Sequence, residues 1–109
     1  MVEYKGKLDT IFGSLSDPTR RDIVKRLAHQ ELTVSEVAKP YARRMSLAAV
    51  SKHLQVLERS GVITKRRVGK QQIVALSPPA LKDASKYLEQ YKKLWEERLD
   101  RLEKFLKNK

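Results

Sequence analysis

The chain has 109 residues, the length of one domain, and no cysteine, which excludes a disulfide scaffold and a thiolate metal site. Lysines and arginines number 24 against 13 aspartates and glutamates, so the net charge is +11. No run approaches the ~20 apolar residues of a membrane-spanning helix, and no basic-then-apolar signal segment opens the sequence. We therefore expect a cytoplasmic protein with no membrane partner.

The positive charge is concentrated in the middle of the chain. Residues 37–79 hold nine basic side chains and one acidic side chain, whereas residues 1–36 hold six of each. A localised basic excess in a small domain points to a polyanionic partner, most often nucleic acid. A merely solubilising surface is the alternative, but solubility does not require concentrated charge.

Apolar spacing and capping residues predict three helices in the first third of the chain. An amphipathic helix over residues 1–15 is predicted by the i, i+3, i+4, i+7 spacing of Leu8, Ile11, Phe12 and Leu15. Asp17 and Pro18 mark the start of a second helix, since aspartate caps free amides and proline fits the first turn. Thr33 and Glu36 have the spacing of a capping box and predict a short third helix, which Pro40 limits.

A fourth helix and a hairpin follow. Ser46 is placed to cap this helix, whose apolar face is formed by Leu47, Val50, Leu54 and Leu57. Gly61 stands where a left-handed residue ends a helix. Residues 62–68 and 71–76 are β-rich and flank a Gly-Lys turn, so they predict a hairpin with a basic tip.

The chain closes with a long helix over residues 79–108. Its apolar stripe has a mean spacing of about 3.6 and consists of Leu81, Ala84, Leu88, Tyr91, Trp95, Leu99, Leu102 and Leu106. About 30 residues at 1.5 Å rise give roughly 45 Å. That length exceeds what a domain of this size can bury against itself, so we expect a second molecule to cover the stripe.

The order of elements predicts a mainly helical winged helix-turn-helix domain with a small β-hairpin. Residues 33–59 form the helix-turn-helix, with a connection at 40–45 that is longer than usual, and residues 62–76 form the wing. A helix fits the major groove of double-stranded DNA, and its first residues reach base edges. The basic wing side chains can follow the adjacent backbone, where they displace counterions: Lys65, Arg66, Arg67 and Lys70.

Three stretches carry a resemblance to a known family. They are Leu-Ser-Asp-Pro-Thr-Arg at residues 15–20, Ser-Leu-Ala-Ala-Val-Ser-Lys-His-Leu at 46–54 and Leu-Glu-Arg-Ser-Gly-Val-Ile at 57–63. Together with the basic hairpin, they resemble the ArsR/SmtB (arsenic-resistance-repressor) family of winged-helix transcriptional regulators. The resemblance implies a repressor and a homodimer built on the first and last helices, residues 1–15 and 79–108.

The resemblance also implies which positions face DNA. In the family the fourth helix lies in the major groove, and the matching DNA-facing positions are Ser46, Ala48, Ala49, Ser51, Lys52 and His53. The two alanines have no hydrogen-bonding side chain, so base reading is expected from Ser51, Lys52, Gln55, Arg43 or Arg44. The expected dimer contacts are Leu8, Ile11, Phe12, Leu88, Tyr91, Trp95, Leu99 and Leu102.

The sequence departs from the metal sensors of that family. Such sensors often carry Glu-Leu-Cys-Val-Cys, whereas residues 31–35 here read Glu-Leu-Thr-Val-Ser, and hydroxyls are poor ligands for soft metals. The other common site uses histidine on the last helix, and no histidine follows His53. We expect no metal site and no cofactor, as in a subgroup lacking metal ligands, while an unknown effector stays open.

Several side chains allow two interpretations. His53, isolated and beside Lys52, is most simply a DNA-backbone donor. Tyr91 and Trp95 either line an effector pocket or, as is commoner for a helical aromatic stripe, form an interface. Arg66 and Arg67 either bind DNA or guard an edge strand. The unfavourable dipole position of Arg20 and Arg21, just inside a helix start, is most simply explained by salt bridges to Asp17 or Glu36.

The sequence thus predicts a sequence-specific, homodimeric repressor that binds an inverted-repeat operator. A nonspecific architectural nucleic-acid-binding protein is the main alternative and would have no preferred site. A winged-helix module that binds protein is another, and it would bind no DNA at moderate salt. An enzyme is not expected, since no carboxylate pair, nucleophile–base set or phosphate-cradling glycine loop is visible.

Overall fold

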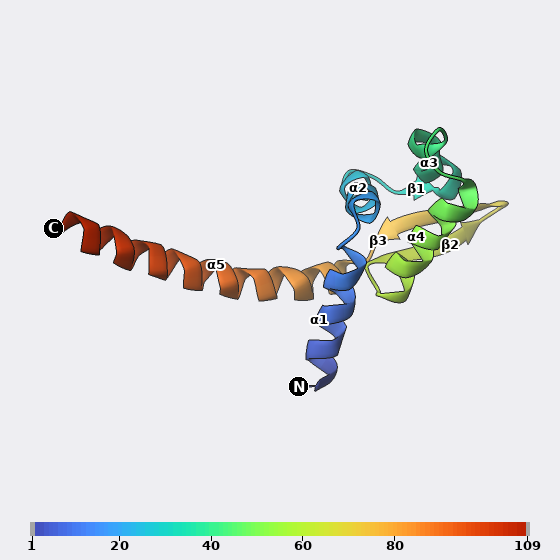
Figure 1. Ribbon diagram of the computed structural model, residues 1–109. Helices are drawn as coiled ribbons and strands as arrows, with labels where there is room; N and C mark the ends of the chain where they lie inside the picture. Colours follow the sequence, from blue (N-terminus) through green and yellow to red (C-terminus); the bar gives the residue numbers. More distant parts are fainter. Residues whose placement is uncertain (1, 109) are drawn as a thin grey trace.

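The computed structural model describes the backbone of residues 2–108 and the side chains of residues 6 and 8–108 (Figure 1). Its elements in chain order are α1 (Val2–Ser14), α2 (Pro18–Leu27), β1 (Leu32–Thr33), α3 (Val34–Ala38), the 3-10 helix η1 (Lys39–Tyr41), α4 (Leu47–Arg59), β2 (Ile63–Val68), β3 (Gln71–Leu76) and α5 (Pro78–Lys107). The predicted fold class, mainly helical with a small hairpin and a long last helix, is confirmed.

Local side-chain chemistry sets the starts of three helices as predicted. Asp17 accepts a hydrogen bond from the Arg20 amide at 3.1 Å and caps α2. Thr33 and Glu36 form the complete capping box of α3. The Ser46 hydroxyl accepts from the Ala49 amide at 3.1 Å and caps α4. Each contact satisfies an amide that would otherwise have no partner inside its helix.

The sheet has three antiparallel strands in the order β1-β3-β2. The hairpin β2–β3 pairs Ile63 with Leu76 and Val68 with Gln71, and its turn includes Gly69 at φ 63°. Strand β1 pairs with β3 on the other side and was not predicted, because two residues carry no readable alternation. This third strand ties the start of α3 to the wing.

One core joins the helix-turn-helix to the hairpin. Its fully buried side chains come from α1, α2, α3, α4, β2, β3 and the turn before β2: Ile11, Ile23, Val37, Val50, Leu54, Leu57, Val62, Ile63 and Val74. Leu8 and Ile11, expected at a dimer surface, are 5% and 0% exposed within the single chain. That expectation is corrected: both side chains belong to the interior, and Phe12 is half-buried with its ring 5.6 Å from that of Tyr87.

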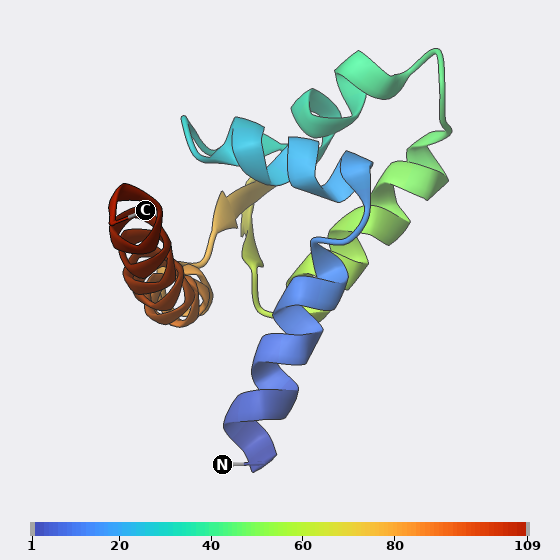
Figure 2. The same ribbon diagram turned by 60° about the vertical axis from the view of Figure 1, so that its left-hand side comes forward.

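Helix α5 leaves the rest of the molecule as a single rod (Figure 1). Figure 2 views it nearly end-on, standing to one side of α1, α2 and α4. Ala80 and Ala84 are buried near its start, whereas every residue from 88 to 108 is exposed. The prediction that the chain cannot bury this stripe is confirmed, and the molecule extends over 66 × 35 × 21 Å. Among the described helices, α5 included, none combines the length and the apolarity that crossing a membrane requires.

Candidate nucleic-acid interface

Helix α4 presents a polar face to solvent because its apolar face is held by the core. Val50, Leu54 and Leu57 are buried, while Ala48, Lys52 and Gln55 are exposed, as are Ser46 and the charged end of the helix. Ala49 and Ser51 are half-buried. Leu47, expected on the buried face, is 62% exposed. Leu47 is exposed because it is the first residue of α4 and lies beyond the edge of the core.

The turn before α4 is anchored on Tyr41, a residue that the sequence analysis missed. The ring is buried, and its hydroxyl donates a hydrogen bond to Asp22. The guanidinium groups of Arg26 and Arg44 lie 5.5 and 5.9 Å from the ring centroid. Burial and the hydrogen bond to Asp22 raise the pKa of Tyr41, so the hydroxyl stays protonated. Arg43 and Arg44, both predicted DNA contacts, are exposed on this fixed turn.

The same turn is also fixed from α2. Arg26 donates to the carbonyl oxygens of Glu36 at 2.7 Å and Val37 at 2.8 Å. These carbonyls lie at the end of α3, where backbone acceptors lack partners within the helix. The arginine therefore joins α2 to the short helix that precedes the turn. These hydrogen bonds could not be predicted from the local sequence pattern, because Arg26 lies ten and eleven residues before its partners.

The basic side chains of the wing are not equivalent. Arg66 forms two hydrogen bonds with the carboxylate of Glu31, and these contacts lower the pKa of that carboxyl group. Lys65 lies 3.4 Å from Glu58. Arg67 donates to the carbonyl oxygen of Gly69, and its neighbour in the turn, Lys70, is exposed. All four cations were predicted from the sequence, but the contact of Glu31, which precedes β1, with the wing was not.

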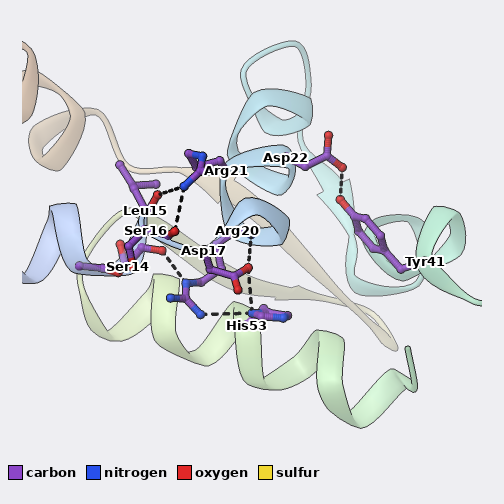
Figure 3. A network of polar contacts seen from close by, with 10 residues as sticks. Ser14, Leu15, Ser16, Asp17, Arg20, Arg21, Asp22, Tyr41 and His53 are labelled. Atoms are coloured by element: carbon purple, nitrogen blue, oxygen red, sulfur yellow. Dashed lines mark hydrogen bonds and ion pairs between the residues drawn. The ribbon is translucent and has the colours of Figure 1, made fainter. Parts of the chain in front are cut away.

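His53 is not the isolated side chain that the sequence suggested. It is half-buried, and its Nδ1 atom lies 3.3 Å from Arg20 Nη1 and 3.9 Å from Asp17 Oδ2 (Figure 3). Partial burial acts to raise the pKa of Asp17. Hydrogen bonds from backbone amides and the nearby His53 act in the opposite direction and outweigh burial, so the pKa is lower than the usual 3.8. The two distances show that the Nδ1 side of the His53 ring faces Asp17 and Arg20 at the start of α2.

Arg20 and Arg21 have a different main role from the expected salt bridges. The Nε atom of Arg20 donates to the carbonyl oxygen of Ser14. Arg21 donates to the carbonyl oxygens of Leu15 and Ser16, each at 2.9 Å. Arg20 thus binds a carbonyl at the last residue of α1 and Arg21 binds carbonyls just after it, near the negative end of the helix dipole, which offsets their position at the start of α2.

These parts lie at one end of the molecule. Figure 1 shows the start of α4 and the tip of the β2–β3 hairpin on the side of the molecule opposite the C-terminal end of α5. The exposed cations at this end include Arg43, Arg44, Lys52, Arg67 and Lys70. A helix with a free polar face, flanked by a basic turn and a basic hairpin, has the shape and charge that duplex DNA binds.

Comparisons with known proteins agree with this geometry. A family model described as "Helix-turn-helix domain" matches residues 15–66. The uncharacterized HTH-type transcriptional regulator YuzN of Bacillus subtilis is 36% identical over 87 residues, covering 74% of this chain and 94% of YuzN. A crystal structure of an ArsR family transcriptional regulator superposes with a TM-score of 0.74 at 36% identity, covering 84% of this chain and 93% of that one.

The chain belongs to the ArsR/SmtB family of winged-helix transcriptional regulators. The transcriptional repressor SdpR of Bacillus subtilis is a further relative, 28% identical over 81 residues, covering 74% of this chain and 88% of SdpR. Within the described residues of this ArsR/SmtB protein, no three histidine, aspartate or glutamate side chains are grouped in a way that would hold a metal ion.

Proposed function

We propose that the protein is a homodimeric repressor that binds an inverted-repeat operator, with two copies of α4 in successive major grooves. The observation that carries the proposal is the outward face of α4. Its apolar residues are locked in the core, which leaves Lys52 and Gln55 exposed beside the basic turn and the wing tip. Repression is proposed because the relative SdpR is named a transcriptional repressor.

The homodimer is proposed from α5. The exposed apolar side chains beyond its first turns follow helical spacing and include Leu88, Tyr91, Leu94, Trp95, Leu99, Leu102, Phe105 and Leu106. A contiguous apolar surface of this kind is characteristic of an interface. A two-fold dimer presents two copies of α4, and a two-fold operator offers two half-sites about 34 Å apart. We further propose that any response to an effector does not use the family's usual cysteine site, since Thr33 and Ser35 stand at the ligand positions.

The proposal is tested by selecting random duplex DNA with the purified protein at about 150 mM salt and sequencing the bound pool. An enriched inverted repeat is the expected result, because a specific dimer retains one sequence family against competing sites. Retention without enrichment would instead mean a nonspecific architectural protein, which the charge of +11 would also support. No retention would leave the basic region to another acidic partner and refute DNA binding.

Base reading is proposed to come from Lys52 and Gln55 on α4. Replacing either with alanine is expected to relax the preference at particular operator positions, each by about 1–3 kcal/mol. The measurement is the same selection, repeated with each variant. The matched control is Lys92→Ala on the exposed face of α5, which leaves the enriched sequence unchanged. If the Lys52 and Gln55 variants select the wild-type operator with equal stringency, α4 does not read bases through these side chains.

A further inference from the structure

We infer that Arg20 is a positioning residue that sets the orientation of α4 against the end of α1, acting through His53. The inference rests on the proposed function, because it concerns the helix proposed to enter the major groove. It assigns a role to the stretch at residues 15–20, which the proposed function does not use. It also gives His53 a role inside the protein in place of a contact with the DNA backbone.

Three contacts place Arg20 between helices (Figure 3). Its Nε atom donates to the carbonyl oxygen of Ser14, the last residue of α1. Its Nη1 atom lies 3.3 Å from His53 Nδ1 on α4. Its own amide donates to Asp17, the cap of α2. From α2, the half-buried Arg20 side chain thus contacts both α1 and α4.

The chemistry of the guanidinium group suits this task. It is planar, with donors in a fixed fork, so two acceptors bound to it are held at a fixed separation. A lysine ammonium is a point donor on a flexible stem and does not impose that geometry. His53 accepts the hydrogen bond when Nδ1 carries the lone pair and Nε2 carries the proton.

The contact adds a directional link to the apolar packing of α4. Val50, Leu54 and Leu57 attach α4 to the core by apolar burial, which is non-directional. A hydrogen bond is directional, and its strength falls steeply with misalignment. His53 directly follows Lys52 and lies two residues before Gln55, so a small rotation of α4 at this point displaces both proposed base-reading side chains.

Arg21 provides a matched control. It neighbours Arg20 in sequence and also donates to carbonyl oxygens just after or at the end of α1, but the hydrogen bonds of its guanidinium go to Leu15 and Ser16 rather than to α4. Arg20→Lys and Arg21→Lys therefore make the same chemical change, keep the same net charge and differ in the link to α4.

The first experiment measures operator affinity, nonspecific DNA affinity and salt dependence for both variants. Arg20→Lys is expected to weaken operator binding roughly tenfold, the effect of losing a charge-assisted hydrogen bond. Arg21→Lys is expected to change it less than about twofold. Nonspecific binding and its salt slope stay the same in both, since charge is retained. Equal operator affinities of the two variants would overturn the inference.

A second pair of variants separates positioning from a direct phosphate contact by His53. His53→Leu removes every ring nitrogen and is expected to weaken operator binding as Arg20→Lys does. His53→Asn restores an acceptor near the Nδ1 position but has no donor at the Nε2 position, and it is expected to recover most of the loss. If the His53→Asn variant binds the operator as weakly as the His53→Leu variant, the Nε2 atom of His53 contacts DNA directly and the positioning role is refuted.

Two controls keep the outcomes distinct. Urea unfolding and sedimentation of each variant show whether its fold and assembly match the wild type. Amide NMR spectra of the free protein give a readout that needs no operator. Arg20→Lys is expected to shift the amides of α4, and Arg21→Lys is not. If the wild type selects no operator, the proposed function fails, and the spectra still decide the positioning role; α4 shifts of equal size in both variants overturn it.

Discussion

At the scale of single residues, Glu31 limits what the wing offers to DNA. Its carboxylate forms two hydrogen bonds with Arg66, although the two residues are 35 positions apart. Both side chains are about half exposed, and an exposed ion pair of this kind contributes little to stability. Its main consequence is that Arg66, like Lys65 beside Glu58, already has a carboxylate partner before DNA binds.

Glu31→Gln is therefore expected to strengthen nonspecific DNA binding. Once freed, Arg66 displaces a further counterion, and the plot of log affinity against log salt becomes steeper by about 0.9. The matched control is Glu103→Gln, which makes the same change in net charge at a carboxylate paired with Lys107 on α5, away from the wing. Salt titrations of both variants measure the effect. Identical slopes in Glu31→Gln and the control would mean that Arg66 does not meet DNA.

Because Arg66 is paired with Glu31, the two adjacent wing arginines are expected to contribute differently to DNA binding. Arg67→Ala is expected to weaken binding to all sequences and to flatten the salt slope by about 1. Arg66→Ala is expected to flatten it less, because Glu31 already neutralises that side chain. Salt titrations of the two single variants give the comparison. A larger effect from Arg66 than from Arg67 would show that DNA breaks the ion pair completely.

At the scale of elements, the helix starts were predictable and the connections between elements were not. Asp17, Thr33 and Ser46 cap their helices through neighbours three residues away, so the pattern is visible in sequence. Strand β1 depends on β3, about forty residues later, and has only two residues. The contact of His53 with Arg20 spans 33 residues. Such pairs follow from the packing of elements and leave no local signal.

Two glycines of the same chain are expected to respond oppositely to alanine. Gly61 ends α4 at φ 82°, a left-handed conformation, so Gly61→Ala is expected to destabilise the fold by about 1 kcal/mol. Gly13 lies in α1, and Gly13→Ala is expected to stabilise it by about 0.5 kcal/mol through helix propensity. An added Cβ meets nothing within 4 Å at either site, so the signs reflect backbone conformation alone. Urea unfolding at one protein concentration measures both changes, and a shared sign would contradict this account.

At the scale of the whole molecule, the sequence did not show whether an apolar side chain is buried within one chain or between two. Leu8, Ile11 and Trp95 all belong to amphipathic stripes. The structure buries the first two in its own core and leaves Trp95 55% exposed. Periodicity identifies the apolar face of a helix, but the length of α5 relative to the rest of the fold decides which part of that face remains uncovered.

Trp95→Ala is expected to weaken the proposed homodimer by on the order of 30-fold, because large aromatic side chains dominate interfaces. Sedimentation across a concentration series measures the change. Val68→Ala is the control, since Val68 is equally exposed, at 55%, but lies on the wing. Unchanged association of the Trp95→Ala variant would mean that Trp95 is not part of the dimer interface. A wild-type protein that sediments as a monomer would refute the proposed homodimer.

The exposure of residues 88–108 also bears on how the last helix forms at all. Most of the stability of a helix in a protein comes from packing of its amphipathic face, and within the single chain the apolar face of this segment stays exposed. In the proposed homodimer, the far end of α5 is therefore expected to gain much of its order from the second copy, so we expect association and folding of this segment to be one process. Titration calorimetry of dimer dissociation at several temperatures is expected to give a heat-capacity change larger than the apolar contact area alone accounts for, because helix melting contributes to it. The cell's concentration of this protein would then set how much of it is fully folded.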